Sequence, residues 1–261
     1  MKLHFRFKLF GFGFFLLGFN SAWAIIGDSV RGVLPGNAPS VCLITFRQSE
    51  REVFCSGALI TPTQVITAGH CFGRRQNVNL RSISIQCGGE QLSRAVRVIT
   101  PDPYDDRLWL NDNQPTHAHD QATIEMMWPA LNAPVSRARA ESDYFGSNTA
   151  LIPGVLCRML GFGTDNSGYM GNLNEADLSN VAMNSLDRVP SGLEGEVIYL
   201  GPRGTDYLPL SADHGDSGGP LLCRRPGERE QLVGTISGYV CGQSTGRRLW
   251  NYITPAWPPV N

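Results

Sequence analysis

The chain opens with one long apolar block and then alternates apolar and polar residues in short runs. The block, Leu9–Phe19, follows a stretch with three basic residues and is followed by the small residues of Ala22–Ala24. This order predicts a secretory signal peptide over residues 1–24. The block is too short to cross a membrane, and no later stretch offers about 20 uninterrupted apolar residues. We therefore expect a product secreted to an extracellular or periplasmic space, with no membrane partner.

The rest of the chain reads as short strands. Runs rich in β-branched and apolar residues are separated by Gly, Pro, Asn and Asp, and few segments follow a helical period. Examples of such runs are Val41–Phe46, Ser82–Ile85, Val96–Ile99 and Leu232–Ile236. Many short strands of this kind predict an all-β fold of barrels or a sandwich. The consecutive prolines Pro258 and Pro259 also argue against a regular terminal helix.

Charge and cysteine content narrow the class of protein. The net charge is −1, which gives no electrostatic reason to expect nucleic acid or an anionic membrane as a partner. The seven cysteines of an exported chain favour disulfide bonds, because oxidising compartments preserve them. Length and composition thus fit a secreted globular protein.

The candidate chemistry centres on a serine between glycines. Ser217 lies in Gly215–Pro220, where glycine backbones can turn sharply and approach a substrate closely. A serine hydroxyl needs a base to react, and His70 and Asp120 precede it in the order His, Asp, Ser. Taken singly, each of these residues has an ordinary structural role; taken together they predict nucleophilic catalysis.

The three motifs and their spacing resemble the trypsin-like (chymotrypsin-fold) serine peptidases, over nearly all of the exported chain. The resemblance implies an all-β fold of two packed six-stranded antiparallel β-barrels of the chymotrypsin type, with the catalytic cleft between them. We place the first barrel at residues 25–133, carrying His70 and Asp120. The second, residues 134–261, carries Ser217 and the specificity pocket.

The resemblance implies a serine endopeptidase that works through an acyl-enzyme intermediate. His70 would take the proton of Ser217 and return it to the leaving amine, while Asp120 holds the imidazole tautomer. The backbone N–H groups of Gly215 and Ser217 would form the oxyanion hole. Asp112 is a rival for the orienting carboxylate, but Asp120 fits the family's pattern better.

An activation ion pair is also implied. Cleavage after the signal peptide would expose Ile25, which resembles the mature amino terminus of this family. Its ammonium would pair with Asp216, because a buried charge is tolerated only when paired. We therefore expect export itself to activate the enzyme.

The family joins two sets of cysteines at matching positions, which here are Cys55–Cys71 and Cys157–Cys223. Cys42 and Cys87 have no family counterpart that we can assign, but both sit in strand-like segments and could pair. Cys241 is expected to be free, because Asp213 stands where many relatives carry its partner.

Substrate preference rests on the pocket positions that the resemblance implies, namely Ser211, Ala212, Ser237 and Tyr239. Ser211 would lie at the pocket base, and a neutral base favours an apolar residue before the scissile bond. Gly238 replaces the usual tryptophan and should reshape the pocket. A shifted Asp213 would instead restore a preference for basic residues.

We expect no cofactor and no metal. His117 and His119 form a pair that could suggest zinc, but no Cys or carboxylate is matched to them. The expected partner is a protein or peptide substrate, and the expected state is a monomer.

Two other classes of protein share part of this pattern. The Gly-x-Ser-x-Gly pattern also marks α/β-hydrolases, whose histidine follows the serine. All five histidines here precede Ser217, which excludes that order. A catalytically silent relative that serves as a binding module remains the alternative.

Overall fold

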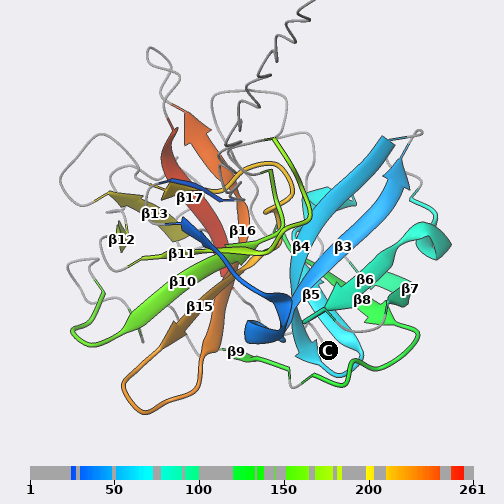
Figure 1. Cartoon of the computed structure of the whole chain (residues 1–261), viewed down its shortest axis with the longest axis horizontal. Coiled ribbons are helices and arrows are strands. Elements are labelled where there is room, and N and C mark those ends of the chain that lie inside the picture. Colours follow the sequence, from blue (N-terminus) through cyan, green and yellow to red (C-terminus); the bar gives the residue numbers. More distant parts are fainter. Residues whose placement is uncertain are drawn as a thin grey trace, which may run out of the picture.

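The chain forms two groups of strands that lie side by side (Figure 1). The computed structural model describes residues 25–27, 30–48, 51–72, 78–89, 92–99, 120–132, 134–137, 144, 151–164, 168–178, 181–183, 198–202, 210–241 and 248–255. Within these ranges, side chains are not described at 26–27, 48, 137, 181–183, 198–202, 210, 239–241, 248–252 and 255. The predicted signal peptide lies outside these residues.

Six strands of the first half close into a barrel in the order β3-β4-β5-β8-β7-β6. Their bounds are β3 Val41–Gln48, β4 Arg51–Thr61, β5 Gln64–Thr67, β6 Ser84–Cys87, β7 Ser93–Ile99 and β8 Ala122–Met126. Side chains alternate between the two faces of a strand. In β3, Cys42, Ile44 and Phe46 pack inside the barrel, while Val41 and Leu43 pack on the other side. Both faces of β3 are therefore apolar.

The second half is a larger sheet. Eight of its strands follow the order β12-β13-β17-β16-β15-β10-β11-β2, and β9 pairs with β16. A separate two-stranded sheet pairs β1 with β14. Their bounds are β1 Ile26–Gly27, β2 Val30–Gly32, β9 Ser136–Arg137, β10 Leu156–Gly161, β11 Asn174–Asp177, β12 Val181–Met183, β13 Ile198–Pro202, β14 Leu210–Ser211, β15 Pro220–Arg224, β16 Gln231–Cys241 and β17 Arg248–Pro255.

The all-β architecture is confirmed, with a detail that the sequence did not indicate. Among the described residues, the second sheet comprises nine strands and recruits β2 from the start of the chain. The helices among the described residues are three short 3-10 turns, η1 (Pro35–Asn37), η2 (Gly69–Cys71) and η3 (Leu80–Ser82). Ser82, predicted to begin a strand, ends η3 instead. In the described part of the chain, none of the helices has the length and apolarity to span a membrane.

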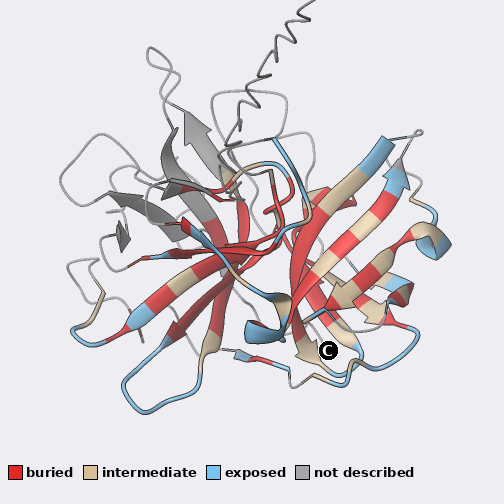
Figure 2. Ribbon diagram, viewed as in Figure 1, coloured by how far each residue is buried: buried red, intermediate tan, exposed pale blue. Residues whose placement is uncertain are grey.

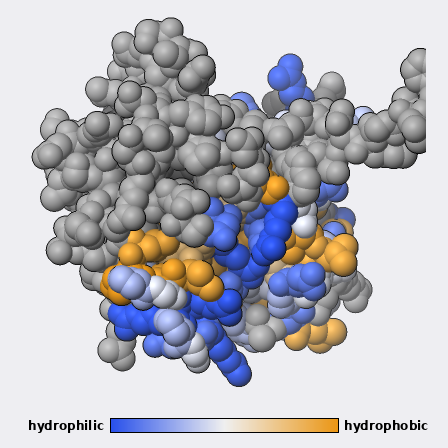
Figure 3. All heavy atoms as spheres, turned by 60° about the vertical axis from the view of Figure 1, so that its left-hand side comes forward, coloured by the Kyte–Doolittle hydropathy of each residue, from blue (hydrophilic) through white to orange (hydrophobic). Residues whose placement is uncertain are grey.

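A shared apolar cluster joins the two halves. It combines Val41, Ala58 and Ile66 of the barrel with Leu160 and Leu222 of the second sheet. Figure 2 shows buried residues along the strands where the two groups face each other. The described surface in Figure 3 mixes hydrophilic and hydrophobic residues, as is usual for globular proteins.

Three disulfides are present among the described residues, Cys42–Cys87, Cys55–Cys71 and Cys157–Cys223. Cys42 and Cys87 lie opposite each other on β3 and β6, so the pairing left open by the sequence is formed. The side chain of Cys241 lies outside the described residues. The three bonds use six of the seven cysteines, so the chain holds no further cysteine for Cys241.

Candidate active site

Strand pairing brings His70 and Asp120 to one end of the barrel. β5 and β8 run antiparallel with Thr67 opposite Ala122. His70 follows β5 in η2, and Asp120 precedes β8, so both lie beyond the same end of this pair. Antiparallel pairing thus explains why residues 50 apart in the sequence meet.

The Asp120 carboxylate is fully buried and well supplied with donors. Its Oδ2 lies 2.6 Å from His70 Nδ1, and its Oδ1 accepts the backbone N–H of His70 at 2.7 Å. The Ser237 hydroxyl also donates to Oδ2. These contacts fix the imidazole ring, with Nδ1 facing Asp120 and Nε2 facing away from it.

Ser217 lies on the other side of the His70 ring from Asp120. Its Oγ lies 2.8 Å from His70 Nε2. The structure thus brings Ser217, His70 and Asp120 into one chain of hydrogen bonds that starts at a buried carboxylate and ends at a hydroxyl. Such a chain can remove a proton from the hydroxyl as it attacks an electrophile.

The loop that carries Ser217 requires glycine at two positions. Gly215 has φ +94°, and a Cβ there would lie 2.8 Å from the Gly163 Cα. Gly218 has φ +83°, and its Cβ would lie 2.1 Å from the Thr67 hydroxyl. Side chains would be strained and would collide with neighbouring elements, so the motif's glycines are required by tight packing.

Asp216 is a second fully buried carboxylate. It accepts backbone N–H groups from Gly163 at 2.8 Å, Asp213 at 2.8 Å and Ile25 at 3.3 Å. Burial raises the pKa of Asp216 to about 7, and these hydrogen bonds oppose that rise. The sequence-predicted neighbours Ile25 and Asp216 are therefore in contact, with Ile25 itself fully buried.

Ser211, the predicted base of the pocket, and Ala212, the predicted pocket residue that follows it, are both buried. Ser211 lies in β14 opposite Ile26 of β1, and its hydroxyl donates to the Ala212 carbonyl at 3.0 Å. The start of the predicted mature chain is thus paired with the predicted pocket base.

Ser237 has a position that sequence reasoning only partly anticipated. The resemblance gave it a backbone contact with substrate, whereas its buried side chain bonds to Asp120. The backbone of Tyr239 lies in β16 opposite Asn251, and its side chain is outside the described residues.

The Asp213 carboxylate is engaged within its own loop. Its Oδ1 accepts the backbone N–H of His214 at 2.7 Å and lies 2.8 Å from His214 Nδ1. His214 is 77% exposed, while the side chain of Asp213 is 10% exposed. In this arrangement the Asp213 carboxylate bonds to the next residue of its loop, the exposed His214.

Sequence reasoning missed Ser56, which lies in β4 next to Cys55. Its buried hydroxyl donates to the Gly215 carbonyl at 2.8 Å. The signal that could have found it is a serine in an apolar strand on the face that packs against the second half.

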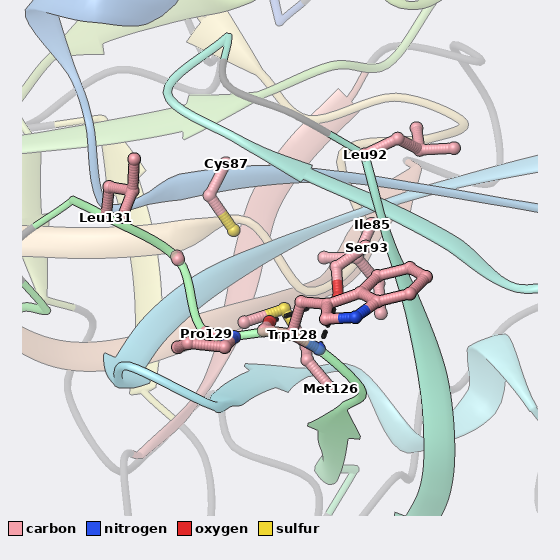
Figure 4. A pocket seen from close by; sticks show the side chains of 9 residues that line it. Ile85, Cys87, Leu92, Ser93, Met126, Trp128, Pro129 and Leu131 are labelled. Atoms are coloured by element: carbon pink, nitrogen blue, oxygen red, sulfur yellow. Dashed lines mark hydrogen bonds between the residues drawn. The ribbon is translucent and has the colours of Figure 1, made fainter.

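A separate pocket of about 240 Å³ lies on the first barrel (Figure 4). It is lined by Ile85, Cys87, Leu92, Ser93, Met126, Trp128, Pro129, Ala130 and Leu131, and none of these belongs to the predicted triad. Within the described ranges no group of three metal-binding side chains occurs. Asp112, His117 and His119 lie outside those ranges.

Comparisons with known proteins identify the family of the chain. The family model described as Trypsin matches residues 30–256. The chain is 31% identical to Trypsin-3 of Salmo salar, over 73% of this chain and 74% of that one. It is 30% identical to coagulation factor XII of Rattus norvegicus over 84% of this chain, which spans only 37% of that relative. Mouse neuropsin, a serine protease, superposes with a TM-score of 0.59 at 21% identity, covering 87% of this chain and 93% of neuropsin. That similarity supports the chymotrypsin-type fold.

Proposed function

The chain belongs to the trypsin family of serine peptidases, and from that premise we propose that it is a secreted serine endopeptidase. The observation that carries the proposal is the row of contacts from Asp120 through His70 to Ser217, at 2.6 and 2.8 Å. The family membership gives the reaction class, a hydrolase, and these contacts support the assignment of Asp120, His70 and Ser217 to the triad.

In the proposed mechanism His70 Nε2 takes the proton of Ser217 as Oγ attacks the carbonyl carbon of a peptide bond. The same proton then passes to the leaving amine, and an acyl-enzyme on Ser217 remains. Water, activated by His70, releases the acid and restores Ser217. Asp120 keeps Nδ1 protonated and stabilises the imidazolium formed in both steps.

The negative oxygen of each tetrahedral intermediate would be met by the N–H groups of Gly215 and Ser217. The carbonyls of the peptides that carry these groups are anchored elsewhere, His214 O on Thr164 N and Asp216 O on Gly219 N. In a trans peptide the N–H points opposite to the C=O. Both N–H groups therefore point away from those anchors, which supports their assignment to the oxyanion hole.

Activation by signal removal follows from the surroundings of Asp216. In the intact chain the Ile25 nitrogen is an amide that lies 3.3 Å from the carboxylate. Cleavage after Ala24 would turn that nitrogen into an ammonium, which can ionise Asp216 and fix its loop. We propose Ile25 and Asp216 as the activation pair, with no separate propeptide.

An apolar residue before the scissile bond is proposed over a basic one. Ser211 is neutral, and the Asp213 carboxylate is bonded to His214 in its own loop. Ala212, Ser237 and Tyr239 stay proposed substrate-binding positions.

The remaining parts of the proposal concern the whole protein. Residues 1–24 are the signal peptide, the product is extracellular or periplasmic, and the barrels divide at residue 133. Protein or peptide substrates are acted on by a monomer without cofactor.

The test is cleavage of a denatured proteome by secreted protein, with Ser217→Ala as the control, followed by sequencing of the new peptide termini. Cleavage by the active protein alone supports the proposal, and apolar residues before the cuts support the pocket assignment. Basic residues there would overturn it. Absence of cleavage and of fluorophosphonate labelling at Ser217, in folded protein that begins at Ile25, would indicate the silent binding module.

A further inference from the structure

One serine hydroxyl of the first barrel reaches the loop that carries Ser217. Ser56 is fully buried in β4, on the face that packs against the second half together with Ala58. A hydroxyl removed from water costs free energy unless it is hydrogen-bonded. Its partners therefore indicate its role.

The hydroxyl joins two separate loops of the second half. It donates to the Gly215 carbonyl at 2.8 Å and accepts the Phe162 N–H at 2.9 Å. Gly215 belongs to the nucleophile loop, and Phe162 precedes Gly163, whose N–H donates to Asp216. Ser56 Oγ is thus a bridge between the loop of the proposed oxyanion hole and the segment that holds Asp216.

The backbone of Ser56 adds two further ties. Its N–H donates to the Ser217 carbonyl at 2.8 Å, and its carbonyl accepts the Thr67 hydroxyl at 2.6 Å. Thr67 ends β5, just before the turn that carries His70. One residue therefore connects the strand before His70 with the loop around Ser217.

The geometry of Gly215 shows why the hydroxyl matters. Gly215 joins the peptide whose carbonyl is His214 O to the peptide whose carbonyl is its own. His214 O accepts Thr164 N at 2.6 Å and Thr164 Oγ1 at 3.1 Å, and Gly215 O accepts Ser56 Oγ. Glycine has wide freedom in both dihedral angles. Fixing both carbonyls removes that freedom and sets the direction of the Gly215 N–H.

Resting on the proposed function, we propose that Ser56 is a positioning residue of the oxyanion hole. Its hydroxyl holds the Gly215 carbonyl and so limits rotation about Gly215, which keeps the N–H of the preceding peptide, held by Thr164, in its donating orientation. Replacing Ser56 by alanine leaves Gly215 O and Phe162 N buried without this partner, which favours rotation about Gly215. The oxyanion exists only in the transition state and the intermediates, so the effect falls on kcat and spares KM.

Ser93 offers a matched control on the far side of the first barrel. It is a buried strand serine whose hydroxyl also serves one backbone carbonyl and one backbone N–H. It donates to Trp128 O at 3.2 Å and accepts Trp128 N at 3.3 Å (Figure 4). Ser93→Ala loses the same kind of bonds without touching the nucleophile loop.

The experiment compares Ser56→Ala, Ser93→Ala and wild type on a peptide substrate and with a peptide aldehyde, whose adduct places an oxygen in the hole. We expect kcat of Ser56→Ala to fall about 30-fold, with KM within about threefold and aldehyde affinity falling in parallel. Ser93→Ala should stay within about twofold of wild type. Equal losses in both variants, or a loss confined to KM, would overturn the inference.

Crystal structures of wild type and Ser56→Ala make the inference independent of activity. If the His214–Gly215 peptide, which carries the Gly215 N–H, keeps its orientation in Ser56→Ala, the positioning role is refuted by that result alone. Wild-type protein without hydrolysis or fluorophosphonate labelling would refute the proposed function, while the orientation of the peptide would still decide the role of Ser56.

Discussion

At the scale of single residues, the site depends on two buried carboxylates with different surroundings. Asp120 is bonded to the imidazole of His70 and to the hydroxyl of Ser237. Asp216 receives backbone N–H groups, yet burial raises its pKa to about 7. The first carboxylate thus bonds mainly to side chains, and the second to backbone N–H groups.

Asp120→Asn should leave the protein folded and lower kcat by about 10⁴, because an amide stabilises the wrong imidazole tautomer. Steady-state kinetics on a peptide substrate would measure this loss. His70→Ala is the companion variant, and it should lose at least as much. A decrease below about tenfold for Asp120→Asn would remove Asp120 from the proposed triad.

The raised pKa of Asp216 predicts a pH dependence of stability in the chain with an intact Ala24–Ile25 bond. The folded carboxyl holds its proton more tightly than the unfolded one, so this contribution is present below about pH 4 and is lost as pH rises through about 7. The loss is at most about 4 kcal/mol. Denaturant unfolding between pH 4 and 8, in a Ser217→Ala background that prevents self-digestion, would show it.

Asp216→Asn should remove this pH dependence. Cutting the chain before Ile25 should reduce it, because the new ammonium favours the ionised carboxylate. Identical profiles for the cut and intact chains would contradict the proposed activation pair.

At the scale of elements, the end of β10 is shaped by the carboxylate that it surrounds. A Cβ at Gly161 would lie 2.1 Å from Asp216 Oδ1, and one at Gly163 would lie 2.5 Å from its Cγ. The two glycines of the Gly-Phe-Gly segment therefore leave the space that the Asp216 side chain occupies. Phe162 N also donates to the Ser56 hydroxyl, so this segment connects β10 both to β4 and to the loop that carries Asp216.

Gly161→Ala should displace the Asp216 carboxylate and lower kcat/KM by at least about 100-fold, with a stability loss of about 1–3 kcal/mol from overpacking. Gly36→Ala is the control, because nothing lies within 4 Å of the Cβ it would add. Kinetics and thermal unfolding of both variants would test this, and equal behaviour of the two would contradict it.

At the scale of the whole molecule, the site exists only because two halves are packed together. His70 and Asp120 come from the barrel, and Ser217 comes from the loop before β15. The shared apolar cluster, with Ile66 on one side and Leu222 on the other, holds these elements in register. Loosening that cluster should therefore affect both stability and catalysis.

Leu222→Ala should destabilise the protein by about 2–5 kcal/mol and preserve a single unfolding transition, because the cluster belongs to both halves. Leu34→Ala, at a side chain that is 74% exposed, should change little. Denaturant unfolding followed by tryptophan fluorescence would distinguish the two. Separate transitions, with only one shifted by Leu222→Ala, would show that the halves unfold independently.

The sequence by itself determined the strands and the identities of the chemical groups. Short runs rich in β-branched and apolar residues predicted β3 and β16, because the composition of a short run is a local property. The motif around Ser217 and its resemblance to a family indicated His70 and Asp120, whose catalytic roles and the division at residue 133 stay predictions. Glycines at 215 and 218 were recognisable because turns demand them.

Only the tertiary structure decided the contacts made across long separations. The pairing of Cys42 with Cys87 depends on the register of β3 and β6, and the recruitment of β2 depends on its edge pairing with β11. The bonds of Ser56 to Gly215 and of Ser237 to Asp120 join residues more than 100 positions apart. A hydroxyl carries no local signal of its partner, since that partner is set by how whole sheets pack.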